Sequence, residues 1–313
     1  MRKTILAFGE VLWDLLPGGP VLGGAPCNFA YRANSLGDRG VIISRLGRDD
    51  LGQRAAALLA QAGMGVEQLQ HDDTLPTGTV QVSFDAARNP DYFIVPKVAY
   101  DAIEVTDELV ELAEQADAFC FGTLVQRAEK SRSTLRALLD VSTRSLKFFD
   151  INLRKNCFTP ETIADSLRRA DVLKLNETEA AYLAKEYGWP EDNLPDVALR
   201  LMERWTLTHC VITLGAQGAL AASVEAGVIY APGYQVKLVD SCGSGDAFAA
   251  AFLHGLLRDR PLEKCIDLGN ALGALVATQR GATETVPSTE LQKLLATPPG
   301  RVTDERFAAL RRE

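Results

Sequence analysis

The stretch DSCGSGDAF, Asp240 to Phe248, contains the residues of this chain with the clearest chemical meaning. Gly243 and Gly245 can adopt backbone conformations that direct successive N–H groups toward one point. The apolar run that follows, Ala247 to Leu257, has helical length, and its N-terminus would add free N–H groups and the positive end of the helix dipole. These features predict a pocket for an anion, and a phosphate suits it.

Asp246 stands in this predicted pocket, where a carboxylate raises the energy of a bound phosphate unless its charge has a task. Accepting a proton from a hydroxyl that attacks a phosphoryl group is such a task. The simpler interpretation is a helix N-terminus in which Asp246 complements the dipole. The stretch lacks the lysine of the P-loop motif, and Phe248 stands where the dinucleotide fingerprint has its third glycine, so neither of those phosphate sites fits.

Short apolar runs alternate with helical periods along the chain, and these elements must position the stretch. The alternation predicts a mostly parallel sheet with helices on both faces, which is a three-layer α/β fold with ligands at the carboxyl ends of the strands. The predicted strands are Thr4 to Phe8, Gly40 to Arg45, Ala118 to Phe121, Lys147 to Ile151, Val172 to Leu175 and Cys210 to Thr213. The predicted helices include Gly52 to Ala62, Lys130 to Leu139, Pro160 to Ala170 and Glu177 to Tyr187.

Two segments interrupt this alternation and predict a small β lid at the edge of the sheet. Residues 11–32 begin with a Gly- and Pro-rich stretch, and residues 72–100 alternate polar and apolar side chains around a turn at Arg88-Asn89-Pro90, which predicts antiparallel hairpins. No long linker divides the chain, so we expect one domain over residues 1–313. The open edge of such a lid needs a cover, which predicts a homodimer through the lid.

Composition and charge exclude several classes of partner. The net charge of −8 and the lack of a Lys/Arg-rich block argue against nucleic acid, because affinity for its phosphates depends on clustered positive charge. No apolar run approaches the roughly 18 residues that cross a bilayer, and Glu10 and Asp14 come too early for a signal peptide. We therefore expect a cytoplasmic protein without a membrane partner. The six cysteines lack CxxC spacing and predict reduced core thiols rather than a zinc site.

Two further stretches, GGAPCNFAYRANSLG and SRLGRDDLG, lie within Gly23 to Gly52. Together with DSCGSGDAF they resemble the two signatures of the PfkB, or ribokinase-like, carbohydrate kinase family, in the order and at the separation found there. The resemblance spans nearly the whole chain. It implies a ribokinase-like fold, a small-molecule sugar as substrate, and ATP with Mg²⁺ as cofactors.

The resemblance also implies roles for individual residues. Asp246 matches the catalytic base, and Gly243, Ser244 and Gly245 match the anion hole. The residues that match sugar-binding positions are Asp14, Gly23, Gly24 and Asn28. Asn176 and Glu179 match the NxxE motif that organises magnesium and phosphate. The nucleotide-binding strand and turn are matched by Thr213, Gly215 and Gly218. Asn270 matches a position at the border of the adenine site.

Several of these residues also have purely structural interpretations. Asn176 followed three residues later by Glu179 is the pattern of a helix capping box, while Asp14 and the Gly23-Gly24 pair also suit a loop and a turn. The family's potassium site, where it occurs, uses the region of Asp240 and a loop near Arg280 to Ala282, so the resemblance allows potassium as a further cofactor. The usual motif reads DTTGAGD, and an anion hole built from backbone N–H groups tolerates the side-chain changes seen here.

The sugar is indicated by GEVLWDLLP near the start of the chain and by DINLR, Asp150 to Arg154. Both resemble the branch of fructokinases and 2-keto-3-deoxygluconate kinases. Arg154 would then face the sugar pocket, where a guanidinium can pair with a substrate carboxylate or hydrogen-bond a neutral sugar or a phosphate. The alternative is a surface arginine near Glu161. Leu12 stands where ribokinases have an asparagine, so we expect fructose, phosphorylated at a primary hydroxyl, with the keto-acid sugar as the alternative.

Three rival functions stay open beside this one. A sugar or nucleotide sensor on the same fold would not need a base, so Asp246 speaks against it. A nicotinamide-dependent oxidoreductase would need a glycine cluster after the first strand, where the chain has Gly9 alone. A nucleoside kinase of the same family would be recognised by faster turnover on adenosine than on any hexose.

Overall fold

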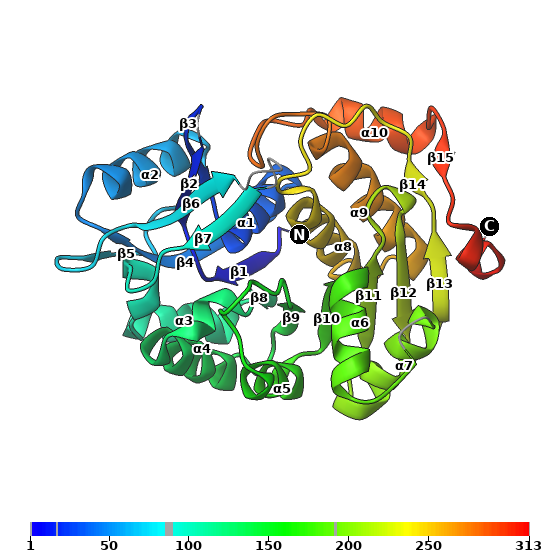
Figure 1. Cartoon of the computed structure of the whole chain (residues 1–313), viewed down its shortest axis with the longest axis horizontal. Coiled ribbons are helices and arrows are strands. Elements are labelled where there is room, and N and C mark those ends of the chain that lie inside the picture. The colour runs from blue at the N-terminus through cyan, green and yellow to red at the C-terminus, as the bar shows by residue number, and fades with distance from the viewer. Residues whose placement is uncertain (1, 17, 85–89, 191–192, 313) are drawn as a thin grey trace.

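A nine-stranded sheet runs through the centre of the computed structural model in Figure 1, which describes residues 2–16, 18–84, 90–190 and 193–312. Seven strands pair in parallel, and two antiparallel strands complete one edge. In order across the sheet the strands are β13 (Gly227–Ala231), β12 (Ala219–Ser223), β11 (His209–Thr213), β10 (Val172–Asn176), β9 (Leu146–Asp150), β8 (Ala118–Phe121), β1 (Thr4–Phe8), β4 (Arg39–Gly47) and β5 (Leu69–Asp72).

Helices cover both faces of this sheet, and successive side chains of a strand point to opposite faces, so consecutive residues of a central strand are apolar. In β1, Leu6 and Phe8 join the core on one face, whereas Ile5 and Ala7 join the core on the other. The first core includes α3 (Asp107–Gln115), α4 (Glu129–Val141), α5 (Pro160–Arg169), α6 (Glu177–Glu186) and α7 (Leu194–Trp205). The second includes α1 (Ala25–Ser35), α2 (Asp50–Gln61), α8 (Ser244–Leu256) and α9 (Leu262–Val276), with α10 (Ser288–Ala296) packed beside α8 and α9. The predicted three-layer α/β arrangement is confirmed.

The six predicted strands and the four predicted helices are present, with ends that differ by two residues or fewer. Helix α8 begins at Ser244, earlier than the predicted Ala247, so Asp246 lies within its first turn. The sequence did not predict the β12–β13 hairpin at the sheet edge. Small elements complete the chain: the two-stranded sheet of β14 (Gly233–Tyr234) and β15 (Arg301–Val302), and the 3-10 turns Ala99–Ala102, Leu124–Arg127, Gly215–Gln217 and Glu305–Leu310.

A separate four-stranded sheet forms over the residues expected in the lid. Its strands, in spatial order, are β3 (Gly19–Gly23), β2 (Leu12–Leu16), β6 (Gly78–Phe84) and β7 (Pro90–Ile94). The β2–β3 and β6–β7 pairs are antiparallel as predicted, but β2 and β6 pair in parallel, which was not anticipated. The expected lid segment 11–32 was too long, because residues 25–32 belong to α1, which packs on α8 and the main sheet. Arg88 and Asn89 of the predicted turn lie outside the described residues.

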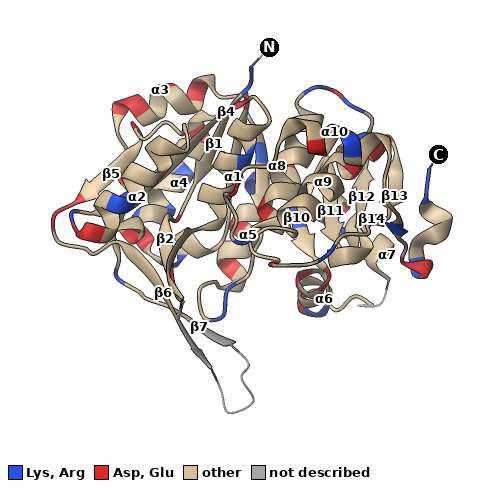
Figure 2. Ribbon diagram, turned by 90° about the horizontal axis from the view of Figure 1, so that it is seen from above, with Lys and Arg blue, Asp and Glu red and all other residues tan. Residues whose placement is uncertain are grey.

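Charges and cysteines are distributed as follows. In Figure 2 the positions of Lys and Arg are scattered along the ribbon among those of Asp and Glu. Within the described ranges, no helix combines the length and the apolar character that a membrane span requires. All six cysteines are free thiols, and five are buried, but Cys242 is exposed and therefore is not the core thiol that the sequence predicted.

Candidate active site

The glycine-rich turn begins helix α8, as the sequence predicted. Gly243 is the residue before the helix and has a left-handed backbone, with φ of 74°. A Cβ at this position would lie 2.3 Å from the Cβ of Ala282, so the turn requires glycine for both its conformation and its packing. The N–H of Ser244 donates to the carbonyl of Ser241 at 3.2 Å. The next N–H groups of the first turn have no carbonyl four residues earlier within the helix, which leaves them available to an anion.

Asp246 is partly buried and is held by Asn28, which belongs to the GGAPCNFAYRANSLG stretch of the N-terminal half. The side-chain amide of Asn28 on α1 donates to Asp246 Oδ2 at 2.8 Å. Burial raises the pKa of Asp246 to about 6, assisted by the charge of Asp150 and opposed by Asn28, Lys174 and Arg154. A carboxylate with this pKa is ionised near neutral pH and still basic enough to accept a proton, as general base catalysis requires.

A buried ion pair lies beneath the turn. Lys174 on β10 donates to both carboxylate oxygens of Asp150 on β9, at 3.0 and 3.1 Å. The two residues are register partners in the sheet, so the parallel pairing itself brings them together. A Cβ at Gly245 would lie 3.4 Å from Lys174 Nζ, which places the ammonium group directly below the turn. Burial lowers the pKa of Lys174, but the charges of Asp150, Glu179 and Asp246 outweigh this effect and raise it, so the ammonium stays charged.

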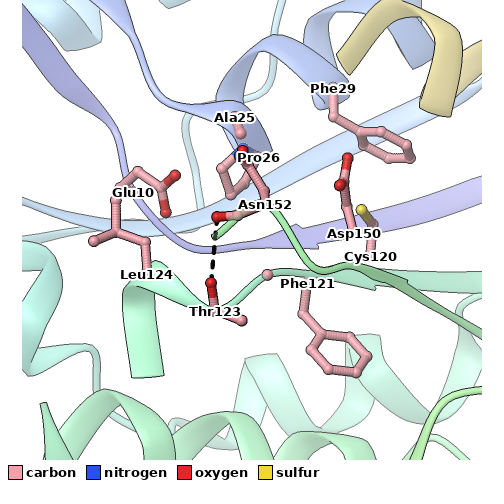
Figure 3. A pocket seen from close by; sticks show the side chains of 11 residues that line it. Glu10, Ala25, Pro26, Phe29, Cys120, Phe121, Thr123, Leu124, Asp150 and Asn152 are labelled. Atoms are coloured by element: carbon pink, nitrogen blue, oxygen red, sulfur yellow. Dashed lines mark hydrogen bonds between the residues drawn. The ribbon is translucent and has the colours of Figure 1, made fainter. Parts of the chain in front are cut away.

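A second acidic side chain, Glu10, lies close to this cluster. It lines a small cavity of about 20 Å³ together with Asp150 and Asn152, and Figure 3 shows these side chains around the space. Glu10 is 5% exposed. Burial raises its pKa to about 7, while its own backbone N–H and Arg154 oppose the shift. Glu10 therefore holds a proton more easily than an ordinary glutamate does, which reduces the negative charge beside Asp246.

The predicted sugar residues lie on the lid strands β2 and β3 and on the first turn of α1, which follows β3 directly. Asp14 on β2 faces Gly23, where a Cβ would lie 3.0 Å from Asp14 Oδ2. Gly24 has φ of 111°, and a Cβ there would lie 2.3 Å from the carbonyl oxygen of Glu10. Asn28 follows one turn later on α1, and its Oδ1 is buried without a hydrogen-bond partner among the described residues. That oxygen can accept a hydrogen bond from a ligand hydroxyl.

Arg154 comes from the loop after β9 and is exposed. Its charge lowers the pKa of Asp14, Glu10 and Asp246, although burial raises each of the three. Arg154 has no salt bridge to Glu161 or to another carboxylate in the described part of the chain. The alternative interpretation, a surface arginine paired with Glu161, therefore has no ion pair to support it. Its positive charge therefore acts on the group of carboxylates that includes Asp14 and Asp246.

The predicted nucleotide residues line a separate pocket on the other side of the turn. This pocket has a volume of about 360 Å³ and is lined by Thr213, Gly215, Gly218, Asn270, Ser244 and Gly245, among others. The side-chain amide of Asn270 donates to the carbonyls of Ala231 and Pro232, so it fixes the backbone beside the pocket. The first turn of α8 thus lines this pocket through Ser244 and Gly245 and contacts Asn28 through Asp246.

Asn176 and Glu179 form the capping box that the structural interpretation predicted. Asn176 Oδ1 accepts from the N–H of Glu179 at 2.9 Å, and Glu179 Oε2 accepts from the N–H of Asn176 at 2.8 Å. The other oxygen of Glu179 accepts from the N–H of Leu153. Asn176 is not among the residues that line the pocket of about 360 Å³. No group of three or more potential metal ligands occurs in residues 2–16, 18–84, 90–190 and 193–312.

Asp240 connects the turn to the loop that the sequence associated with potassium. Its Oδ1 accepts from the N–H of Cys242 at 2.9 Å, and its Oδ2 accepts from the N–H of Gly281 at 3.1 Å. Both oxygens therefore accept hydrogen bonds from the backbone, and Asp240 lies beside the loop of residues 279–284, which contains the Arg280 to Ala282 stretch.

Sequence reasoning missed three residues of this cluster: Glu10, Asp150 and Lys174. A signal for Lys174 was present, because a lysine inside the apolar run VLKLN is rarely buried unless it is paired. Asp150 begins the DINLR motif, of which only Arg154 was given a role. Glu10 carries no signal that distinguishes it from an ordinary loop carboxylate.

The sequence profile of pfkB family carbohydrate kinases matches residues 20–289. The chain belongs to this family. It is therefore a sugar kinase, a phosphotransferase that acts on a sugar hydroxyl. A fructokinase of Klebsiella pneumoniae is 30% identical over 94% of this chain and 100% of its own length. This similarity confirms the resemblance to the fructokinase branch, which the opening and DINLR motifs had indicated.

Solved structures confirm the ribokinase-like fold of this pfkB kinase. A fructokinase from Vibrio cholerae, described in a form bound to fructose, ADP and potassium ion, is 24% identical, with a TM-score of 0.79 over 94% of this chain and 98% of that one. A 2-dehydro-3-deoxygluconokinase from Thermotoga maritima is 19% identical, with a TM-score of 0.82 over 94% of this chain and 100% of that one. Because both substrate classes occur on closely similar backbones, the fold alone does not select the sugar.

Proposed function

We propose that this pfkB kinase is a fructokinase that transfers the γ-phosphate of ATP to a primary hydroxyl of fructose, with Asp246 as the general base. The observation that carries the choice of a neutral sugar is the position of Arg154. Its charge already acts on three carboxyl groups, those of Glu10, Asp14 and Asp246. A keto-acid sugar would bring a fourth carboxylate to this one exposed guanidinium, whereas a polyol adds hydroxyl groups that carboxylates and amides can bind.

The sugar is expected to lie under the lid, between Asp14 and Asn28. Asp14 can accept hydrogen bonds from sugar hydroxyls, and the unpartnered Oδ1 of Asn28 can accept another. Gly23 and Gly24 let the backbone approach the sugar ring without side-chain obstruction. Because Asn28 also holds Asp246, a hydroxyl bound to Asn28 would stand close to the base. Closure of the lid would exclude water, so that ATP is not hydrolysed without a sugar.

The chemical step assigns a separate task to each residue of the cluster. Asp246 accepts the proton of the attacking hydroxyl, which makes the oxygen a better nucleophile. The N–H groups of the turn and the ammonium of Lys174 stabilise the negative charge that develops on the transferred group, and losing one such donor costs about 3 kcal/mol. Asp150 keeps Lys174 in place and charged. Arg154 counters the charges of Asp14 and Asp246 at the sugar end.

Asn176 and Glu179 would influence a bound magnesium ion through the shape of their loop rather than as direct ligands. Both oxygens of Glu179 already accept backbone N–H groups, so Asn176 and Glu179 shape the loop around the phosphate site rather than offering free ligands. When bound with ATP, Mg²⁺ neutralises phosphate charge and makes the γ-phosphate easier to transfer. The nucleotide itself is expected to occupy the pocket lined by Thr213, Gly215 and Asn270.

A substrate panel tests the proposal. ATP consumption is measured with magnesium and matched concentrations of fructose, 2-keto-3-deoxygluconate, ribose or adenosine, for the wild type and for Asp246→Asn. We expect the highest kcat/KM on fructose and a loss of about 10²–10⁴-fold in kcat in the variant, the usual contribution of a general base. ADP binding should be retained, because an asparagine can still accept the hydrogen bond from Asn28.

The other outcomes of the panel are equally informative. Preference for 2-keto-3-deoxygluconate would refute the argument from Arg154, and preference for adenosine would move the chain to the nucleoside kinases of the family. Sugar binding without turnover on any substrate would favour a sensor. Equal kcat for the wild type and Asp246→Asn would remove Asp246 from the mechanism.

A further inference from the structure

Arg32 is a charged residue that the proposed mechanism does not use, yet its side chain is completely buried. It lies on α1, one turn after Asn28, and has 0% exposure. Its terminal NH2 group donates to the carbonyl oxygen of Ala282, and its guanidinium carbon lies 5.0 Å from the centre of the Tyr31 ring. Its Nε and its other terminal nitrogen have no hydrogen-bond partner among the described residues. A buried guanidinium with so few partners is costly unless its charge is used nearby.

The carbonyl that Arg32 contacts belongs to the loop that supports the phosphate turn. The Cα of Ala282 would lie 2.7 Å from a Cβ at Gly243, so the loop and the turn are in direct contact. Gly281, the preceding residue, donates its N–H to Asp240 at the start of the turn. Helix α1 thus holds the turn from two sides, through Asn28 to Asp246 and through Arg32 to Ala282.

The charge of Arg32 also acts on this region. Burial lowers the pKa of Arg32, and the negative charges of Glu284 and Asp246 oppose that effect. Glu284 lies in the 279–284 loop, and Asp246 lies in the first turn of α8. The guanidinium therefore places a fixed positive charge beside a loop carbonyl and behind the proposed phosphate site.

We infer that Arg32 is a positioning residue that serves as the built-in cation of the phosphate turn, so that the enzyme holds this turn without a monovalent metal ion. The potassium site allowed by the family resemblance would use the same Asp240 region and the same loop. That site does not fit a second cation well, because Ala282 already offers its carbonyl to Arg32 and Asp240 already accepts two backbone N–H groups. A potassium ion in this region would also be repelled by the positive charge of the Arg32 guanidinium, which lies against the same loop.

The inference rests on the proposed nucleotide and phosphate site, so its first test uses nucleotide binding rather than turnover. The affinity for MgADP is measured by calorimetry in potassium chloride and in choline chloride at equal ionic strength. For the wild type we expect dissociation constants that agree within about twofold. For Arg32→Ala we expect binding in choline to weaken by about tenfold or more, because the loop and the turn lose their tether, and to recover on addition of potassium or methylguanidinium.

The control is Arg258→Ala. Arg258 follows the C-terminal end of α8 and pairs with Asp38. Like Arg32 it is an arginine beside α8, but it lies at the opposite end of that helix from the glycine-rich turn. This variant should bind MgADP as the wild type does in both salts. Once a sugar substrate is known, kcat of Arg32→Ala should rise with potassium or methylguanidinium while the KM for the sugar changes little, a pattern that loss of packing alone does not produce.

Two results would overturn the inference: MgADP binding or turnover of the wild type that depends on potassium, or an Arg32→Ala variant that binds MgADP normally in choline. The first requires no variant, so it applies even if Arg32→Ala does not fold. Absence of MgADP binding by the wild type in either salt would instead refute the proposed nucleotide site. Failure on every sugar with intact MgADP binding would refute only the proposed fructokinase activity.

Discussion

The pH dependence of turnover tests the proposed role of Asp246 as the general base. Its pKa is raised to about 6, chiefly by burial, so kcat/KM should show an acid limb near pH 6. Because the base must be ionised to accept a proton, activity should fall about tenfold for each pH unit below this limb and be flat above it. At pH 5 the wild type should therefore retain roughly a tenth of its plateau activity.

Two neighbours of Asp246 allow this limb to be moved in opposite directions. Asn28 donates a hydrogen bond of 2.8 Å to Asp246, and such bonds to charged groups contribute about 1.5–3 kcal/mol. Asn28→Ala should therefore raise the pKa of Asp246 and shift the limb upward by about one to two pH units, since one unit corresponds to about 1.4 kcal/mol. Asp150 raises the pKa of Asp246 through its charge, so Asp150→Asn should shift the limb downward.

The assay is the initial rate at subsaturating sugar, from pH 5 to pH 9 at constant ionic strength. Asp246→Asn serves as the control, because its residual activity should lack the limb and report only the titration of ATP itself. An acid limb of unchanged position in both Asn28→Ala and Asp150→Asn would refute the assignment of this ionisation to Asp246. Shifts of the limb in the same direction in both variants would refute the assigned effects of Asn28 and Asp150 on the pKa of Asp246, without identifying the base.

Three further predictions follow from the packing of the site and lid. Lys174→Met should lower the free energy of unfolding, measured by urea denaturation, by about 3–5 kcal/mol, because Asp150 is left buried without its partner. The double variant Lys174→Met with Asp150→Leu should recover the stability but not kcat. Gly243→Ala should lower kcat at least about tenfold, since a Cβ does not fit at this position. Gly188→Ala is the control, because Gly188 also has a left-handed backbone, with φ of 69°, but a Cβ there would have no atom within 4 Å. This control should lose only about 1–2 kcal/mol of stability and keep its kcat. The proposed dimer through the lid should give twice the chain mass of 33.9 kDa in light scattering, and a single-chain mass would contradict it.

Local features of the sequence predicted the parts of the molecule that depend on local physics. Gly243 and Gly245 predicted the turn, because a left-handed backbone at a helix start strongly favours glycine. The apolar runs predicted the central strands, because a parallel strand is buried on both faces. The capping box of Asn176 and Glu179 could also be recognised, since its two hydrogen bonds join residues only three positions apart.

Contacts between distant segments could not be predicted in the same way. The hydrogen bond from Asn28 to Asp246 spans 218 positions, and it exists because α1 packs on α8. The pairing of Lys174 with Asp150 depends on the neighbouring positions and register of β9 and β10. The parallel pairing of β2 with β6 joins two hairpins whose sequences indicate only their own turns. Each of these contacts depends on strand order or helix packing, which the pattern of one chain leaves open.

Helix α1 connects the proposed sugar site to the glycine-rich turn at the start of α8, a connection that the individual motifs do not reveal. Its N-terminus follows Gly23 and Gly24 at the proposed sugar site, and Asn28 and Arg32 on its next turns reach the phosphate turn and the loop behind it. A helix is stiff over this distance, so a displacement of its N-terminus by the sugar must also displace the contacts to Asp246 and Ala282. We therefore expect substitutions at the N-terminal end of α1, beside Gly24, to change the KM for the sugar and kcat together. Changes confined to the nucleotide pocket should leave the KM for the sugar unaltered.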